Sequence, residues 1–397
     1  MIDTLLTTSN ILPHDHERAL LIGRVWTDGL GPTLVRVTAD HVFDISSIAA
    51  TSAALLEMDD PVGAVREIGG PRIGGTAAIL ANSASGRHDP ALPWFLAPCD
   101  LQAIKAAGVT FVASMLERVI EEQARGDAGR AEAVRKSVVG IIGDNLRSVK
   151  PGSEQAAKLR DVLIAQGVWS QYLEVGIGED AEVFTKAQPM SAVGIGADIG
   201  LHPKSVWNNP EPEIVLAVNS RGETRGCTLG NDVNLRDFEG RSALLLGKAK
   251  DNNASAAIGP FIRLFDADFG IDDVRNCELA MRVTACDGGF EMHGASSLAM
   301  ISRDPLDLVN QTMGAPQART HQYPDGFLLY LGTMFAPTQD RHGPGQGFTH
   351  ELGDIVSVAT PKLGMLVNQV THSDKAPAWT YGTGALMRDL ARRGLLA

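Results

Sequence analysis

The sequence predicts an α+β protein. Helix-like segments dominate the stretch from about residue 101 to 165, and from Tyr172 onward short apolar runs are separated by Gly, Pro, Asn and Asp, a pattern typical of strands and turns. Because helices come early and strands late, this class is favoured over a doubly wound sheet. A chain of 397 residues is also long for one hydrophobic core, which predicts two domains, or one large domain with an appendage.

The first 95 residues are predicted to form a small α/β domain. Two β-type runs, at 19–26 and 32–37, precede a helical segment over 46–58. A stretch rich in Gly, Ser and Pro then extends over 69–90 and is typical of a loop or linker. We therefore predict a small N-terminal domain over 1–95 and a larger domain over 96–397.

The larger domain is predicted to begin with helices and to continue with strands. A strong helix is predicted over 113–124, and further helix over 127–165 with an interruption near Gly143. The later apolar runs are bounded by turn residues, and we interpret them as strands: Glu182–Thr185, Ile214–Val218, Cys227–Gly230, Glu278–Thr284, Gly326–Leu331 and Ile355–Ala359.

Composition and charge exclude several classes of function. The formal net charge is −12, so no excess of Lys and Arg exists to neutralise nucleic-acid phosphates. No apolar run approaches the roughly 20 residues that cross a bilayer. We expect a cytoplasmic protein with neither nucleic acid nor membrane as a partner. The four cysteines are far apart, form no Cys-x-x-Cys pair and are expected to be buried thiols: Cys99, Cys227, Cys277 and Cys286.

Three carboxylates form the most informative pattern in the chain. Glu211 and Glu213 stand two residues apart, so on a strand both side chains point to the same face. Asp232 ends the next apolar run, which a returning antiparallel strand would place beside the pair. Three oxygen ligands without clustered Cys or His favour Mg²⁺, Mn²⁺ or Ca²⁺ over zinc. The alternative is a charged sheet edge that discourages aggregation.

Two lysines, Lys248 and Lys250, follow the carboxylates. A lysine close to a divalent cation loses its proton more easily and can act as a base. The alternative is that both are surface charges, because lysine is mostly exposed in folded proteins.

Four motifs in order resemble those of the fumarylacetoacetate hydrolase superfamily, from about Leu96 to the C-terminus. They are Asn209-Pro-Glu-Pro-Glu-Ile-Val-Leu, Gly230-Asn-Asp-Val-Asn-Leu-Arg-Asp, Lys250 with Gly259-Pro260, and Leu331-Gly-Thr with Leu352-Gly-Asp. The whole chain is most similar to the bacterial sugar-acid branch, the 2-keto-3-deoxy-D-xylonate (or arabinonate) dehydratases. The resemblance implies a mixed β-sandwich roll as the catalytic domain. It also implies metal ligands at Glu211, Glu213 and Asp232, an active-site lysine at Lys250, and a pocket threonine at Thr333.

The chain departs from the family's hydrolases at one position. Those enzymes have Gly-x-Asn-Tyr-x-x-His-x-x-Glu, in which the histidine activates the attacking water. The corresponding stretch here begins at Gly108, places Ser114 at the histidine position and keeps Glu117 one helical turn away on the same face. The absence of the water-activating histidine disfavours carbon–carbon bond hydrolysis and favours elimination.

The resemblance therefore implies a metal-dependent dehydratase, a carbon–oxygen lyase of pentose (D-xylose) catabolism. It would convert 2-keto-3-deoxy-D-pentonate to 2,5-dioxopentanoate (α-ketoglutarate semialdehyde), forming an enolate at C3 and losing the C4 hydroxyl as water. A bound cation, Mg²⁺ with Mn²⁺ or Ca²⁺ as alternatives, would polarise the ketone. We predict Lys250 or Glu117 as the base, with the other, assisted by Ser114, helping to protonate the departing hydroxyl. Glu239 and Arg236 are further candidates for substrate contact.

Plainer roles stay open for four of these residues. Ser114 would then be a helix-packing residue, Glu117 a surface partner of a basic neighbour, and Glu239 a cap. Arg236 would form a salt bridge with Asp237 or another acid. The rival functions are a hydrolase or decarboxylase of diketo or oxo acids, and a non-catalytic protein that binds sugar acids. A homodimer or homotetramer is implied by the resemblance alone.

Overall fold

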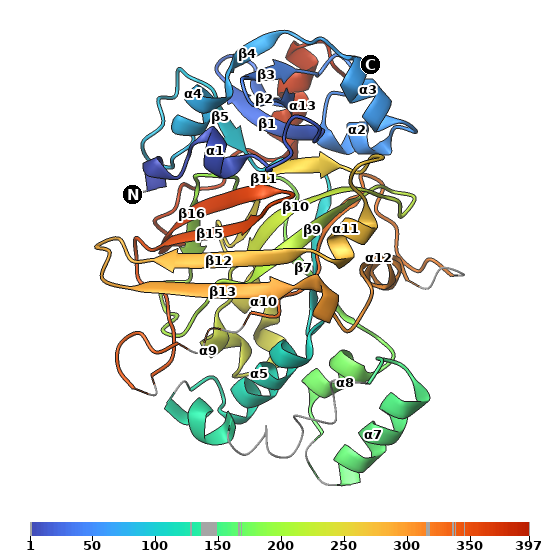
Figure 1. Ribbon diagram of the computed structural model, residues 1–397, viewed down its shortest axis with the longest axis vertical. Helices are drawn as coiled ribbons and strands as arrows, with labels where there is room; N and C mark the ends of the chain where they lie inside the picture. The colour runs from blue at the N-terminus through green and yellow to red at the C-terminus, as the bar shows by residue number, and fades with distance from the viewer. Residues whose placement is uncertain are drawn as a thin grey trace.

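The fold consists of two packed β-sheets with helices at both ends (Figure 1). The computed structural model describes residues 2–127, 129–135, 149–165, 167, 169–314, 318–335, 337, 339–344 and 346–396. The predicted α+β class is confirmed, since strands and helices are both abundant and the sheets mix parallel with antiparallel pairs. Across these described ranges, no helix combines the length and the apolar character that crossing a bilayer requires.

Within the described residues the larger sheet has eleven strands. Their order is β4-β3-β2-β1-β11-β10-β9-β14-β6-β7, with β5 paired to β1 beside this path. Only the β14–β6 pair is parallel among these described strands. The bounds are β1 (Leu21–Thr27), β2 (Gly31–Val37), β3 (His41–Asp44), β4 (Arg72–Gly75), β5 (Trp94–Leu96), β6 (Ala103–Gly108), β7 (Glu182–Ala187), β9 (Pro212–Val218), β10 (Thr224–Asp232), β11 (Ala256–Leu264) and β14 (Phe327–Tyr330).

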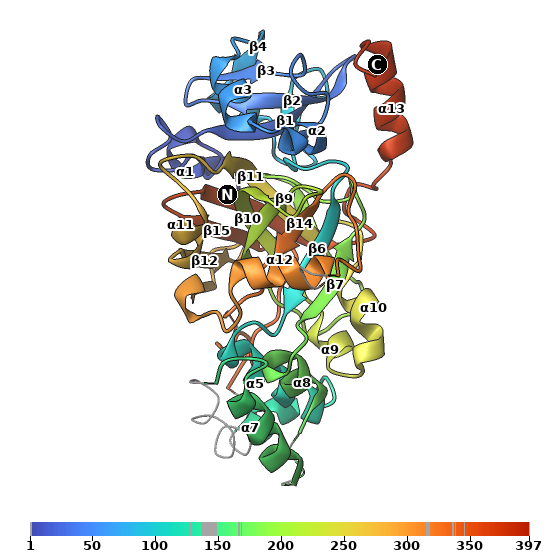
Figure 2. The same cartoon turned by 90° about the vertical axis from the view of Figure 1, so that its right-hand side faces the viewer.

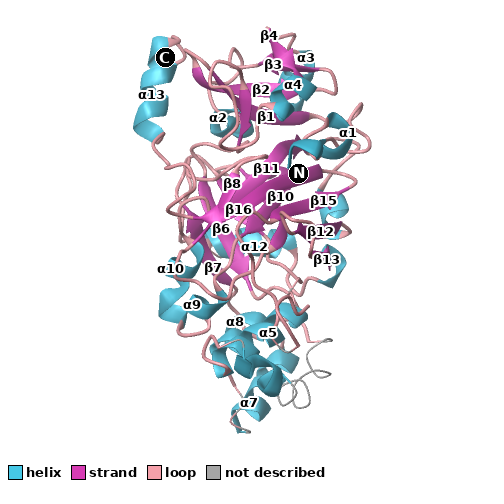
Figure 3. Ribbon diagram, turned by 90° about the vertical axis from the view of Figure 1, so that its left-hand side faces the viewer, coloured by secondary structure: helices cyan, strands magenta, loops and turns pink. Residues whose placement is uncertain are grey.

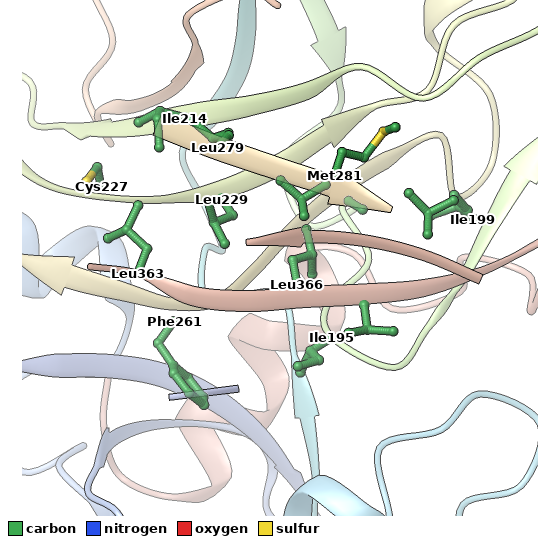
Figure 4. Close-up of a cluster of buried hydrophobic side chains, with 14 of the residues drawn as sticks. Ile195, Ile199, Ile214, Cys227, Leu229, Phe261, Leu279, Met281, Leu363 and Leu366 are labelled. Atoms are coloured by element: carbon green, nitrogen blue, oxygen red, sulfur yellow. The ribbon is translucent and has the colours of Figure 1, made fainter. Parts of the chain in front are cut away.

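The smaller sheet covers one face of the larger one. Its order is β13-β12-β15-β16-β8, and its bounds are β8 (Asp198–Leu201), β12 (Glu278–Thr284), β13 (Glu291–Ser297), β15 (Ile355–Thr360) and β16 (Gly364–His372). β12 alternates exposed and buried residues because one of its faces meets solvent. Figure 4 shows Leu229 of β10, Met281 of β12 and Leu366 of β16 meeting between the two sheets. β9, by contrast, is buried along its whole length.

The helices gather mainly at the two ends of the molecule. Figure 2 and Figure 3 place α5, α7 and α8 at the end opposite the N-terminal strands, and α13 beside β2. The bounds are η1 (Ile2–Thr4), α1 (Thr8–Ile11), α2 (Ser52–Glu57), α3 (Pro61–Glu67), α4 (Thr76–Ala81), α5 (Val112–Gln123), α7 (Glu154–Ala165), α8 (Gln171–Ile177), α9 (Arg236–Glu239), η2 (Ala243–Leu245), α10 (Leu246–Lys250), α11 (Ile271–Arg275), η3 (Leu298–Met300), α12 (Pro305–Met313) and α13 (Thr383–Arg392).

Two sequence-based predictions need correction. The stretch over 69–90 is not only a linker, because it contains β4, which pairs with β3, and α4, which buries Ile79 and Leu80. Cys286 is exposed, whereas the other three cysteines are buried as predicted. The predicted interruption at Gly143 lies outside the described residues. The division of the chain after residue 95 stays a prediction, and β1 and β11 join the two parts in one sheet.

An ion pair between buried Arg263 and partly buried Asp15 ties the N-terminal segment to the larger sheet. Arg263 on β11 is 1% exposed, and its guanidinium donates to both carboxylate oxygens of Asp15 at 2.7 and 2.9 Å. Burial alone would raise the pKa of Asp15, but Arg263 and Lys362 lower it to about 2. This carboxylate therefore stabilises the folded state while it is ionised.

Asp15→Asn is expected to lower the free energy of unfolding by about 3 kcal/mol at pH 7, because Arg263 would remain buried without its counter-charge. A carboxyl with a lowered folded-state pKa contributes stability above its unfolded value of 3.8, and this contribution is lost as the pH falls toward 2. Thermal unfolding should thus show a constant gap between wild type and variant above about pH 5, narrowing below about pH 4. A gap that widens in acid would contradict this.

Candidate active site

Three carboxylates meet where β9 begins and β10 ends. The two strands are antiparallel, Glu213 lies opposite Gly230, and the Asp232 backbone N–H donates to the Glu211 carbonyl at 3.0 Å. One oxygen atom from each of Glu211, Glu213 and Asp232 lies within 4.8 Å of the others, and all three residues are buried. The clustering predicted from the sequence is therefore present.

Local structure explains the Gly230-Asn-Asp motif. A Cβ atom at Gly230 would lie 2.6 Å from Val215 on the neighbouring strand β9 and 2.4 Å from the ring of Tyr330 on β14, beyond β9, so a side chain does not fit there. The Asn231 side-chain oxygen accepts from the Glu211 backbone N–H at 3.0 Å. Gly230 thus allows close strand packing, and Asn231 fixes the backbone that carries Glu211 beside Asp232.

Two buried lysines contact the carboxylates. Lys250, the last residue of α10, places its Nζ 2.6 Å from Glu211 Oε2 and 3.0 Å from Asp232 Oδ2. Lys186 on β7 places its Nζ 2.7 Å from Asp232 Oδ1 and also donates to the backbone carbonyl of Lys250. Lys248 is exposed, so only the second of the two predicted lysines belongs to the site. Lys186 was missed by the sequence analysis.

Helix α5 contributes Ser114 and Arg118 to the wall of the triad cavity. The Ser114 hydroxyl donates to the Phe111 carbonyl at 2.9 Å. Arg118, which the sequence analysis also missed, contacts Glu211 directly. Glu117 does not line this cavity, because its two carboxylate oxygens bind Arg135 at 2.6 and 3.0 Å.

The remaining candidates divide between two cavities. Thr333 and Glu239 line the triad cavity, and the Gly332 N–H donates to Glu213 Oε2 at 2.6 Å. Arg236 instead lines a neighbouring cavity, and its Nε lies 3.0 Å from Glu121 Oε1. The alternative of a salt bridge to another acid is therefore the one present for Arg236.

The triad cavity is small and the neighbouring one is not. The first has a volume of about 20 Å³, enough for roughly one water molecule. The second has about 310 Å³ and is lined by Arg135, Trp207, Arg236 and Phe348, among others. The two are linked through Glu121, which contacts Arg118 on one side and Arg236 on the other.

Acidic groups outnumber basic ones around the triad. Among the described residues, the side chains that line the cavity include five carboxyl groups and two cations, an excess of three negative charges if all are ionised: Glu182, Glu211, Glu213, Asp232 and Glu239 against Arg118 and Lys250. A divalent cation would offset part of this excess, and hard oxygen ligands are those that Mg²⁺ prefers.

Burial separates the pKa values of these carboxyl groups. Burial, with Asp232 and Glu211 nearby, raises the pKa of Glu213 well above its usual range. Burial also acts to raise the pKa of Glu211, but Lys250 and Arg118 lower it to about 2. Burial and the charge of Glu239 raise the pKa of Glu182 to about 7. The site therefore holds ionised and protonated carboxyl groups side by side near neutral pH.

Comparison with known proteins gives two curated relatives, and no family model matches the chain. The chain is 30% identical over 200 residues to a probable 2-keto-3-deoxyxylonate dehydratase of Haloferax volcanii, covering 50% of this chain and 63% of the relative. It is 28% identical over 194 residues to the 2-dehydro-3-deoxy-D-arabinonate dehydratase of Saccharolobus solfataricus, covering 49% and 60%. The match thus spans less than two thirds of each relative's length.

Solved structures share the fold over most of the chain. The apo form of 2-keto-3-deoxy-D-arabinonate dehydratase has a TM-score of 0.61 at 19% identity, covering 89% of this chain and 99% of that one. The same enzyme with magnesium and 2,5-dioxopentanoate gives 0.60 at 18% identity, with the same coverage. A fumarylacetoacetate hydrolase from Exiguobacterium antarcticum gives 0.50 at 16% identity, covering 89% and 100%.

Proposed function

We propose that this chain is a member of the fumarylacetoacetate hydrolase superfamily and a metal-dependent dehydratase of 2-keto-3-deoxy sugar acids. Its product from 2-keto-3-deoxy-D-pentonate would be 2,5-dioxopentanoate. The observation that carries the proposal is the buried triad with Lys250 against it and Ser114 where the family's hydrolases have their histidine. The distant relationship to two dehydratases supports the same reaction class.

The residues present fit a divalent cation. Glu211, Glu213 and Asp232 would hold it, because each offers a buried carboxylate oxygen to the same point. The chemistry it supplies when bound is Lewis-acid polarisation of the substrate ketone, which acidifies the C3 proton. A protein of the same fold solved with magnesium and 2,5-dioxopentanoate supports this choice of ion and ligand class.

Lys250 is the best-placed base for the C3 proton. Burial disfavours its charge, but Asp232 and Glu211 raise the pKa of Lys250 and keep it protonated while they are its partners. Were these carboxylates to hold a cation, the Lys250 ammonium would lose them as ion-pair partners and its pKa would fall. The neutral amine would take the proton from C3 to give the enolate, and the enolate's electron pair would then form the C3–C4 double bond as the C4 oxygen leaves.

A protonated carboxyl group in the cavity wall would complete the loss of water. Glu182 and Glu239 both line the cavity and both have a raised pKa because they are buried, so either can donate a proton to the leaving C4 hydroxyl. Glu117 would take this role only after its contacts with Arg135 break. The resulting alkene then isomerises: one proton leaves C5 and one enters C3 to give the C4–C5 enol, which gains a proton at C4 and loses its O–H proton to become the aldehyde of the product.

Proton NMR in D₂O tests the reaction class. With 2-keto-3-deoxy-D-pentonate and Mg²⁺, the protein should yield 2,5-dioxopentanoate, with deuterium entering at C3. Pyruvate with a two-carbon aldehyde would instead indicate carbon–carbon cleavage and sink the dehydratase proposal. Binding of the sugar acid without any chemical change would favour the non-catalytic alternative.

A further inference from the structure

We propose that Arg118 is a positioning residue that holds the ligand Glu211 in place, and that the planar fork of its guanidinium sets the affinity of the site for a divalent cation. The inference rests on the proposed function in one respect, namely that Glu211 ligates the metal. It does not depend on which sugar acid is the substrate.

Arg118 touches three carboxylates at once. Its Nη2 contacts Glu211 Oε1, and its Nη1 lies 2.7 Å from Glu121 Oε2 and 3.0 Å from Glu239 Oε2. The side chain is 11% exposed and lines the triad cavity. One Nη atom thus contacts the proposed metal ligand Glu211, and the other contacts Glu121 and Glu239, which are not part of the triad.

The two oxygens of Glu211 are held by different cations. Lys250 Nζ lies 2.6 Å from Oε2, while Arg118 holds Oε1. When Oε2 is released from Lys250, Oε1 stays with Arg118, so Glu211 presents a single oxygen in a fixed direction. Groups that orient a metal ligand in this way commonly change affinity by about 10–100-fold when they are removed.

Further contacts, through Glu121, fix the position of Arg118 itself. Glu121 accepts from Arg118 through Oε2 and lies 3.0 Å from Arg236 Nε through Oε1. The Arg236 guanidinium in turn lies over the Trp207 ring, 5.4 Å from its centroid. This chain of contacts leaves the guanidinium little freedom. A lysine would carry the same charge but would lack the rigid fork that reaches Glu211 and Glu121 together.

The test is a Mn²⁺ titration of metal-stripped protein, followed by the electron paramagnetic resonance signal of the free ion. Arg118→Lys and Arg118→Gln should each raise the dissociation constant of Mn²⁺ by about 10–100-fold. Glu121→Gln, which loosens Arg118 and touches no proposed ligand, should raise it by a smaller factor. Arg341→Lys is the matched control. Arg341 also binds a buried carboxylate through both Nη atoms, which lie 2.6 and 2.8 Å from the two Oδ atoms of Asp354.

The possible results separate a positioning role of Arg118 from the effect of its charge alone. Affinity in Arg118→Lys equal to wild type would overturn the inference, since charge alone would then suffice. Tighter binding in Arg118→Gln would overturn it as well, because Arg118 would then be a competitor of the metal. Should the Arg118 variants fail to fold in a thermal unfolding control, an unchanged affinity in Glu121→Gln would overturn it. Wild-type protein that binds no Mn²⁺ would instead refute the metal-dependent function itself.

Discussion

Lys250→Met is expected to lose dehydratase turnover by at least about 10³-fold while binding a divalent cation about ten-fold more tightly. Turnover falls because the base for the C3 proton is gone. Affinity rises because the Lys250 ammonium occupies Glu211 Oε2 and Asp232 Oδ2, two of the oxygens that a cation would use. Removing it leaves the carboxylates with one fewer competing positive charge.

Thermal unfolding with and without Mg²⁺ measures the second half of this prediction. The metal-free variant should unfold at a lower temperature than wild type, because buried carboxylates lose their counter-charge, and Mg²⁺ should raise its Tm by more than it raises that of wild type. Lys248→Met is the matched control, since that lysine is exposed two residues away. A Lys250→Met protein that neither binds metal nor folds would show that the lysine is structural.

Glu213→Gln is expected to lower metal affinity and turnover together by at least about 100-fold. An amide keeps the size of the side chain but removes the anionic charge that a hard cation requires. The variant should also fold at least as well as wild type without metal, because burial raises the pKa of Glu213 and ionising it there is unfavourable.

Calorimetric titration with Mg²⁺, alongside the turnover assay, checks this. Glu278→Gln on β12 is a suitable control, because it changes an exposed strand glutamate that faces away from the site. Wild-type metal affinity in Glu213→Gln would remove Glu213 from the ligand set. Retained turnover with lost metal affinity would separate the chemistry from the cation altogether.

The carboxylate cluster could be predicted from the sequence because strand geometry is periodic. Alternation placed Glu211 and Glu213 on one face, and the next apolar run had to return antiparallel to bring Asp232 beside them. Both inferences need only local spacing and one strand pairing. The same cannot be said of the first 95 residues, where β4 and α4 lie inside a stretch whose composition is that of a loop.

The cationic side chains of the site were harder to predict from the sequence than the carboxylates, because their positions depend on helix geometry and on the tertiary fold. On α5, side chains four and seven positions apart differ in direction by about 40° and 20° around the helix axis, whereas side chains three positions apart differ by about 60°. Arg118 and Glu121 therefore lie in the stripe of Ser114, whereas Glu117 is turned to Arg135. The spacing of three residues from Ser114 suggested Glu117, whereas Arg118, four residues after Ser114, is the one that lines the cavity.

Lys186 had a weaker signal that could have been used. Glu182, Phe184 and Lys186 alternate along β7, so all three face the same side, and the first two line the triad cavity. The alternation predicts that Lys186 shares a face with Glu182, but not that this face is buried. That Lys186 reaches Asp232, however, depends on where β7 and β10 lie relative to each other in the folded chain.

A metal add-back assay tests the proposed dehydratase reaction and its dependence on a cation most directly. Metal-stripped protein is mixed with 2-keto-3-deoxy-D-pentonate, Mg²⁺ is titrated in, and 2,5-dioxopentanoate is followed with its NAD(P)-dependent dehydrogenase. For a metal-dependent dehydratase we expect no product without metal, a rate that saturates with Mg²⁺, and loss of that rate in Lys250→Met. A rate that is the same in metal-free and Mg²⁺-loaded protein, or no product at any metal concentration, would contradict the proposed function.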